Sequence, residues 1–91
     1  MQQMTIESRD GLQVLTVSGE LDTFGAQAFR DKLSGLRSSD RFAIDLGSLS
    51  FIDSAGLHAL FSVGRVAKEV GASVVFVVPL ASPVRRVIDL V

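Results

Sequence analysis

Apolar and polar positions along the chain follow two alternating patterns, the two-residue period of strands and the longer period of helices. A short run from Thr5 to Ser8 is followed by the turn sequence Asp10-Gly11 and then by the β-rich run Leu12–Ser18. An Asp-Gly pair between two such runs predicts a hairpin whose first strand lies at an edge of a sheet. Leu15 and Val17 share one face of the second strand.

A first helix is predicted after this hairpin. The segment Gly19–Thr23 breaks the second strand, and either Asp22 or Thr23 can cap the helix by accepting a hydrogen bond from an unpaired backbone N–H. The helix is expected to run from about Phe24 to about Leu36. One of its faces is apolar at helical spacing and consists of Ala26, Phe29, Leu33 and Leu36.

The middle of the chain predicts a strand followed by the longest helix. Phe42–Leu46 forms the strand. The connection after it, Leu49–Ile52, contains apolar residues and is not purely polar. The second helix opens at Asp53-Ser54-Ala55-Gly56. It ends before Gly71, a residue type that is common directly after a helix.

The last predicted elements are a buried strand and a short helix. Ser73–Val78 is continuously apolar, as expected for a strand buried on both faces of a parallel sheet, and Pro79 ends it. Ser82-Pro83 is typical of a helix start. The helical apolar pattern is still in phase at the final residue, so we expect a truncated last element. Its apolar positions are Val84, Val87, Ile88 and Val91.

The order of these elements, β-β-α-β-α-β-α, predicts a single α/β domain over residues 1–91. Successive strand–helix–strand units with right-handed crossovers pair their strands in parallel. We therefore expect a mixed, mostly parallel sheet of about four strands packed with helices.

Composition removes several classes of function. The 91 residues include no Cys and one His, which excludes disulfides, thiolate metal sites and a structural zinc site. Nine Lys and Arg against ten Asp and Glu give a net charge of −1, which lacks the positive field of a nucleic-acid binder. No apolar run is long enough to span a membrane. We expect a cytoplasmic domain without cofactor, metal, nucleic acid or membrane partner.

Enzyme chemistry has few candidates. Asp22, Asp45 and Asp53 lie at or near the ends of strands, where open parallel sheets place their sites, but cap or turn roles are the simpler interpretation. His58 follows Ser54 by four residues, yet this serine is not in a nucleophile-elbow sequence, which disfavours a Ser-His-Asp triad. The glycines match no phosphate-binding motif. His58 is interpreted as a surface residue.

Ser54 has two compatible interpretations. On spacing alone it caps the second helix. Its hydroxyl is also expected at an exposed helix start, where phosphorylation would add about −1.5 to −2 charges. The helix N-terminus would tolerate that charge, but Asp53 beside it would make the surface strongly acidic, so a docked partner would have to leave. The small residues Ala55 and Gly56 would let a partner approach the hydroxyl closely.

Three segments carry a family resemblance: Gly19-Glu20-Leu21-Asp22, the run Leu-Ser-Phe-Ile-Asp-Ser-Ala-Gly-Leu over 49–57, and Ser-Pro-Val-Arg-Arg-Val-Ile-Asp-Leu over 82–90. Together they resemble the STAS domain and, more closely, the bacterial anti-sigma factor antagonists. The resemblance covers nearly the whole chain. Its most specific part is Asp-Ser-x-Gly-Leu at a helix start after a strand.

The resemblance implies a partner-switching protein rather than an enzyme. The unphosphorylated antagonist would bind an anti-sigma factor that is also a serine kinase of the histidine-kinase-like ATPase fold, and a sigma factor would be released. Phosphorylation of Ser54 would switch the antagonist off, and a serine phosphatase would reset it. The implied partner-binding residues are Asp22, Thr23, Asp53, Ser54, Ala55 and Gly56.

The sequence departs from the family pattern in two ways. Position 55 is Ala where a second Ser or a Thr is common, which leaves Ser54 as the only hydroxyl in the turn and Ser50 as the next candidate. Members usually continue past the equivalent of Leu90, and we expect a monomer or a weak dimer here.

Two other functions compete with this one. In the first, the chain is a STAS scaffold subunit of a transport or stress-sensing assembly, where Ser54 is only a cap and the partner is constitutive. In the second, it is a small enzyme or nucleotide-binding module that uses Asp22, Asp45 and Asp53.

Overall fold

The computed structural model describes residues 2–89 of the chain. Five strands and three helices alternate as the sequence predicts, apart from one additional strand. In chain order the elements are β1 (Gln3–Arg9), β2 (Leu12–Leu21), α1 (Thr23–Lys32), β3 (Arg41–Asp45), β4 (Leu49–Ile52), α2 (Ser54–Val70), β5 (Ser73–Val77) and α3 (Arg85–Asp89).

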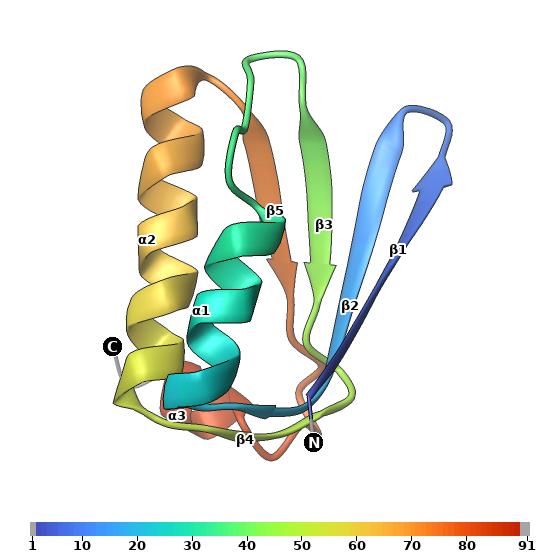
Figure 1. Ribbon diagram of the computed structural model, residues 1–91. Helices are drawn as coiled ribbons and strands as arrows, with labels where there is room; N and C mark the ends of the chain where they lie inside the picture. The colour runs from blue at the N-terminus through green and yellow to red at the C-terminus, as the bar shows by residue number, and fades with distance from the viewer. Residues whose placement is uncertain (1, 90–91) are drawn as a thin grey trace.

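The sheet is mixed and mostly parallel, in the order β1-β2-β3-β5, with β4 paired to the far end of β2 (Figure 1). The predicted hairpin between β1 and β2 is confirmed, and its turn residues Asp10 and Gly11 have φ of 51° and 82°. Both values fit the left-handed turn that joins tightly paired strands. Strands β2, β3 and β5 pair in parallel, as the crossovers predict.

Helices α1 and α2 pack side by side across one face of the sheet (Figure 1). The core lies between these two layers. Leu15 of β2 and Ile44 of β3 are register partners, both fully buried, and Phe29 of α1 is fully buried as well. Burial of each such side chain contributes about 1.5–3 kcal/mol. The core of this two-layer structure holds the ends of β2 and β4 in place. No helix among residues 2–89 is long and apolar enough to cross a membrane.

The predicted break of β2 at Gly19 is wrong, and the connection Leu49–Ile52 is a strand. Gly19 has a φ of 83°, and the strand register shifts between Gly19 and Glu20. This irregularity lets β2 turn away from β3 and pair in parallel with β4, so the sheet has five strands instead of about four. Leu49 and Ile52 are buried, while the residues between them are exposed.

Two element boundaries and the burial of one strand also differ from the prediction. Helix α1 ends at Lys32 rather than Leu36, because the chain turns into a left-handed Gly35 with a φ of 77°. Strand β5 is not buried on both faces, because α1 and α2 cover one face of the sheet and the alternate residues on the other face are exposed. Helix α3 begins at Arg85, after a turn that follows Pro83. The predicted continuation of this helix to Val91 lies outside the described residues.

Candidate functional site

Two helices begin next to each other at one end of the molecule. Strand β2 leads into α1 and β4 leads into α2, and the last residues of the two strands, Leu21 and Ile52, are register partners. The backbone N–H of Asp53 donates to the carbonyl oxygen of Leu21 at 3.3 Å. The parallel strands therefore place Asp22 and Asp53 side by side, each directly before a helix.

Both helix starts have the same local structure. The Asp22 carboxylate accepts a hydrogen bond from the Gly25 N–H at 2.9 Å, and the Asp53 carboxylate accepts one from the Gly56 N–H at 2.9 Å. Each aspartate is thus an N-cap that satisfies an otherwise unpaired donor. The sequence interpretation of Ser54 as the cap is wrong, because Asp53 occupies that position and Ser54 is the first helical residue.

The Ser54 side chain is exposed at the first position of α2. Within residues 2–89, no hydrogen bond engages its hydroxyl. The nearby Ser50 hydroxyl instead donates to the Gly19 carbonyl oxygen at 2.9 Å, which holds β4 against β2. Of the two serine candidates, Ser54 is therefore the one whose hydroxyl has no hydrogen-bond partner among residues 2–89. Thr23 is also exposed, at the first position of α1.

Gly56 fixes how closely α2 approaches the end of β2. A Cβ at this buried position would overlap the Leu21 carbonyl oxygen and would lie 2.8 Å from Cγ1 of Ile52. The contacting groups are backbone and a buried side chain, so they have little room to move. The sequence argument that Gly56 leaves room for a partner is wrong for this residue, because the space it leaves is filled by the protein's own β2.

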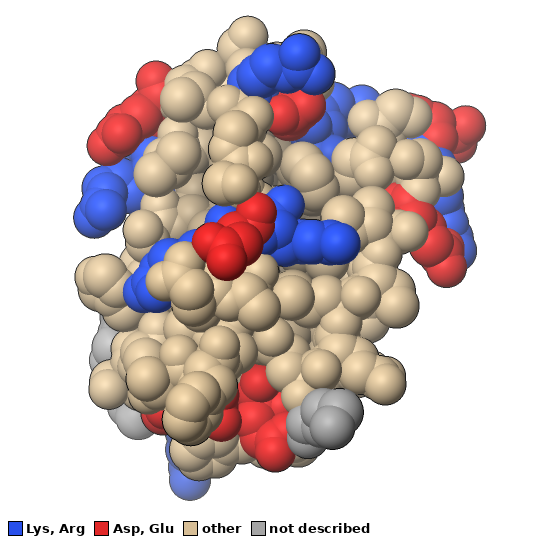
Figure 2. All heavy atoms as spheres, viewed as in Figure 1, with Lys and Arg blue, Asp and Glu red and all other residues tan. Residues whose placement is uncertain are grey.

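The surface around Ser54 combines exposed aromatic rings with carboxylates. Phe24, in the first turn of α1, is 90% exposed, and Phe51 of β4 is 50% exposed. Figure 2 shows acidic atoms gathered beside an uncharged surface at the end of the molecule where Figure 1 places the starts of α1 and α2. Exposed aromatic side chains next to polar groups are typical of a protein-docking surface. Sequence reasoning missed both phenylalanines, although each lies within three residues of a capping aspartate.

Of the remaining candidates, Asp45 lies apart from this surface, whereas His58 lies one helical turn beyond Ser54 on α2. The Asp45 carboxylate accepts from the Gly47 N–H at 2.8 Å, and its register partner is Thr16, five residues before the end of β2. His58 is exposed, and Arg30 of α1 donates to its Nδ1 at 3.1 Å. His58 is thus a surface residue, as predicted. Residues 2–89 contain no group of three His, Cys, Asp or Glu side chains placed to hold a metal.

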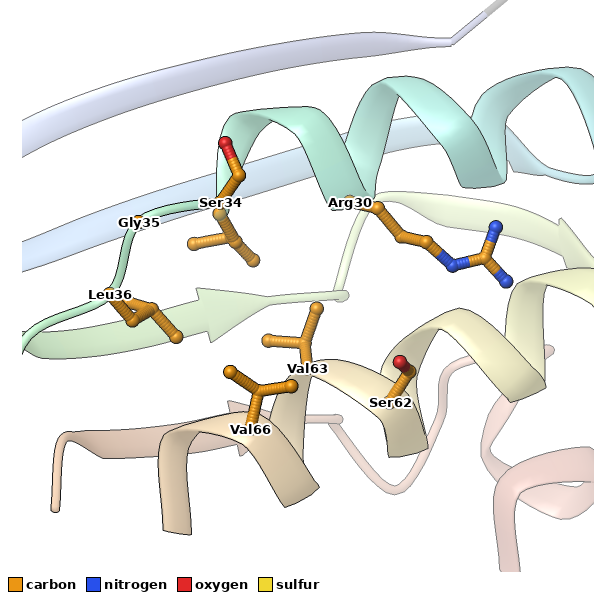
Figure 3. Close-up of a pocket in the computed structure, with 8 residues that line it drawn as sticks. Arg30, Ser34, Gly35, Leu36, Ser62, Val63 and Val66 are labelled. Carbon is orange, nitrogen blue, oxygen red and sulfur yellow. The ribbon is translucent and has the colours of Figure 1, made fainter. Parts of the chain in front are cut away.

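A shallow apolar hollow of about 140 Å³ lies between the end of α1 and the middle of α2 (Figure 3). The α2 residues that line it begin at Ser62, eight residues beyond Ser54, which corresponds to about 12 Å along a helix. The hollow is therefore separate from the surface around the two helix starts. Its lining is Arg30, Leu33, Ser34, Gly35, Leu36, Ser62, Val63 and Val66.

Comparison with known proteins identifies the family. The model of the STAS domain matches residues 3–91. The chain is a member of the STAS domain family. Within that family, it is 32% identical over 90 residues to the anti-sigma-F factor antagonist RsfB of Mycobacterium tuberculosis, covering 96% of this chain and 71% of RsfB.

Solved structures agree with this assignment. The crystal structure of an anti-sigma factor antagonist from Mycobacterium paratuberculosis superposes with a TM-score of 0.74 and 31% identity, covering 99% of this chain and 77% of that one. The antagonist SpoIIAA in its unphosphorylated form matches with a TM-score of 0.69 and 21% identity, over 100% and 84% of the two chains. The fold also occurs within larger proteins, such as Mglu, of which this STAS domain covers 20% at a TM-score of 0.75 and 23% identity.

These matches place the chain in the anti-sigma factor antagonist family. These relatives are named for antagonism of another protein, an anti-sigma factor, and not for a catalysed reaction. The predicted fold class, a single α/β domain with a mixed, mostly parallel sheet packed with helices, is the fold of these antagonists.

Proposed function

We propose that this STAS domain is a phosphorylation-controlled antagonist that binds an anti-sigma factor through the surface around Ser54. The unphosphorylated form captures an anti-sigma factor that is also a serine kinase, and the sigma factor held by that kinase is released. Phosphorylation of Ser54 ends the capture. The observation that carries this proposal is the exposed Ser54 hydroxyl, which no group within residues 2–89 engages, beside two exposed phenylalanines.

The phosphoryl transfer needs only a reactive hydroxyl from this chain. The Ser54 oxygen bonds to the γ-phosphorus of ATP held by the kinase, and the bond from that phosphorus to the β,γ-bridging oxygen breaks. ADP leaves, and the hydroxyl proton passes to a base on the kinase. A substrate serine must lie where the kinase can reach it, and the first position of α2 meets that condition.

The switch is electrostatic and leaves the fold in place. A phosphate adds about −1.5 to −2 charges to a surface that already carries the carboxylates of Asp22 and Asp53. Within the domain, the N-terminus of α2 compensates part of this charge. A docked partner has no such compensation, since its contact surface would have to desolvate the phosphate. The phosphorylated antagonist therefore dissociates from a partner that the unphosphorylated form holds.

The neighbouring residues have distinct roles in this proposal. Asp53 and Gly56 fix the start of α2 and so position the hydroxyl, while Ala55 keeps the next position small. Asp22 and Thr23 border the same surface from the start of α1. Burial of the exposed Phe24 and Phe51 side chains would add hydrophobic stabilisation, the dominant favourable term in most protein association.

The names of two relatives support an anti-sigma factor as the class of partner. RsfB is named an antagonist of an anti-sigma-F factor, and SpoIIAA is described in an unphosphorylated form. We extend both features to this chain, and with them a serine phosphatase that removes the phosphate. The site of action is then the cytoplasm, where sigma factors meet RNA polymerase.

Intact-mass analysis after incubation with candidate anti-sigma serine kinases and ATP tests this function. The native chain is expected to gain one phosphate, and Ser54→Ala is expected to gain none. Ser50→Ala is the matched control, because it removes the neighbouring hydroxyl and leaves Ser54 in place. A phosphate on Ser54→Ala, or none on the native chain with a kinase that binds it, would overturn Ser54 as the acceptor. Stable binding without any phosphorylation would favour the scaffold hypothesis.

A further inference from the structure

Arg30 of α1 and His58 of α2 form a hydrogen-bonded pair that connects the two helices. Nη2 of Arg30 lies 3.1 Å from Nδ1 of His58. Because a guanidinium can only donate, Nδ1 is the acceptor, and the proton of the neutral ring is on Nε2. Figure 3 shows the Arg30 side chain extended away from Ser34 and toward the earlier turns of α2, the direction in which His58 lies.

This pair has more hydrogen-bond donors than acceptors. A guanidinium carries five N–H groups, and within residues 2–89 the Arg30 side chain uses them on His58 alone. The neighbouring carboxylate is engaged elsewhere, since Asp31 accepts from the Gln27 side chain at 2.8 Å. In the same part of the chain, Nε2 of His58 has no hydrogen-bond partner. Guanidinium and imidazole donors that lack an acidic partner are suited to bind an oxyanion such as a phosphate.

The start of α2 places Ser54 next to this pair. Ser54 lies four residues before His58, so the two exposed side chains share one face of the helix. Residues at this spacing have Cβ atoms about 5–6 Å apart. Helical side chains also lean toward the N-terminus, which brings the His58 ring over the turn that begins at Ser54. A phosphate on Ser54 is therefore within reach of both partners.

We propose that Arg30 and His58 form an internal binding site for a phosphate attached to Ser54. The phosphate oxygens accept hydrogen bonds from the remaining guanidinium N–H groups and from Nε2 of His58. This inference rests on the proposed phosphorylation of Ser54, and it adds which residues of the domain hold the phosphate. The two residues act after phosphoryl transfer, so the transfer itself does not require them.

Such a site offsets the repulsion that a phosphate meets at the start of α2. Its charge of about −1.5 to −2 lies next to the Asp53 carboxylate, and Asp22 is close by at the end of the paired strand. The helix N-terminus offers only a partial positive charge. Arg30 adds a full positive charge from α1. The phosphate is therefore held toward α1, and the phosphorylated domain stays folded.

Phosphoserine incorporated at position 54 during synthesis of the chain tests this site without any kinase. Phosphorus NMR follows the last proton of the phosphate as the pH is changed. A nearby guanidinium favours the fully ionised phosphate. The otherwise native chain is therefore expected to bind this proton about threefold more weakly than the Arg30→Gln variant, an effect typical of an exposed ion pair. An equal proton affinity in the two chains would overturn the proposal.

Arg65→Gln is the matched control, because it removes the same charge from α2 at a distance from Ser54. Arg65 lies eleven residues beyond Ser54, about 16 Å along the helix, where it pairs with Glu69. Arg65→Gln is expected to leave the titration of the phosphate unchanged. If it weakens the effect as much as Arg30→Gln does, the effect comes from net charge alone and the proposal is wrong.

A second readout concerns the side chains themselves. The guanidinium NMR signal of Arg30 is expected to shift when residue 54 carries the phosphate, while that of Arg65 stays in place. His58→Ala is expected to reduce the Arg30 shift, because the imidazole holds the guanidinium toward Ser54. Circular dichroism checks that every variant is folded. An Arg30 signal that does not respond to the phosphate would contradict the proposal.

The failure of this site and the failure of the proposed function are distinguishable. If no anti-sigma kinase phosphorylates Ser54, the proposed function fails, whereas the titration still decides whether Arg30 and His58 bind a phosphate at that position. If the titration shows no effect of Arg30, the internal site is wrong, and the intact-mass result for Ser54 is unaffected.

Discussion

The starts of α1 and α2 have the same local sequence pattern, an aspartate, a hydroxyl residue, one further residue and a glycine. Their caps are alike, with hydrogen bonds of 2.9 Å at each and nearly equal backbone angles at Asp22 and Asp53. The two starts differ in what lies against the glycine. A Cβ on Gly25 would meet mainly the flexible end of the Gln2 side chain, whereas a Cβ on Gly56 would meet the Leu21 backbone.

The two helix starts therefore share a capping motif, but only the start of α2 is also held by packing against a backbone. Capping alone defines where a helix begins, but packing against another strand defines where its first residues lie in space. At α2 both conditions hold, so Ser54 is presented in one orientation. At α1 the cap is the same but the glycine packs mainly against a flexible side chain, so Thr23 borders the surface without the same support. In the proposed function, this contrast favours Ser54 over Thr23 as the residue that carries the switch.

The largest expected effect is on stability, and it distinguishes substitution of Gly56 from substitution of Gly25. Gly56→Ala is expected to lower the free energy of unfolding by about 3 kcal/mol, because overpacking against backbone forces α2 away from β2. Gly25→Ala is expected to cost less than about 1.5 kcal/mol, since the Gln2 amide can move aside. Urea denaturation of both variants measures the difference. Equal losses would show that the two helix starts are equally tight.

The next effect concerns binding. Ser54→Asp is expected to weaken capture of the anti-sigma kinase at least tenfold, about 1.4 kcal/mol, although one carboxylate carries less charge than a phosphate. Thr23→Asp places the same charge at the equivalent position of α1 and is expected to weaken capture less. Titration calorimetry compares the two variants with the native chain and with Ser54→Ala, which is expected to bind normally. A stronger effect of Thr23→Asp would move the centre of the docking surface to α1.

The two caps are expected to contribute equally to stability. Asp53→Ala and Asp22→Ala each remove one hydrogen bond to a helix N–H, and each is expected to cost about 1 kcal/mol. Thermal unfolding followed by circular dichroism measures both losses. If one cap costs much more than the other, the similarity of the two starts does not extend to their energetics.

The smallest effect is expected at His58, which is close to Ser54 in sequence but whose described hydrogen-bond partner is Arg30. His58→Ala is expected to change stability by less than about 0.5 kcal/mol, as is usual for an exposed side chain. The rate of Ser54 phosphorylation is also expected to stay the same. A kinase assay with matched enzyme concentrations checks this, and a large loss of rate would return His58 to the functional site.

Much of the fold follows from the sequence because the hydrophobic periods of its main elements are regular. The hairpin at Asp10-Gly11, the helix ending at Gly71 and the parallel pairing of the central strands were all predictable from local chemistry. Strand β4 was not, because four residues between a turn and a helix give too short a pattern. Its existence depends on the irregular backbone at Gly19, which redirects β2 toward it.

The helix start at Asp53–Gly56 was predictable from the sequence, but the structural roles of its residues were not. The segment Asp53–Gly56 was identified, yet the cap was assigned to Ser54, and the role of Gly56 became clear only from its distance to β2. The exposed faces of β5 were missed for a similar reason. An apolar run looks the same in a strand that is covered on both faces and in one that is covered on a single face, and only the positions of the helices distinguish them.

The most direct test of the central claim compares the affinity of one anti-sigma serine kinase for the unphosphorylated chain and for the chain phosphorylated at Ser54. We expect measurable binding of the unphosphorylated form and at least tenfold weaker binding of the phosphorylated form, with both forms equally folded by circular dichroism. Equal affinity of the two forms would contradict the account, because the charge on Ser54 would then have no control over the partner.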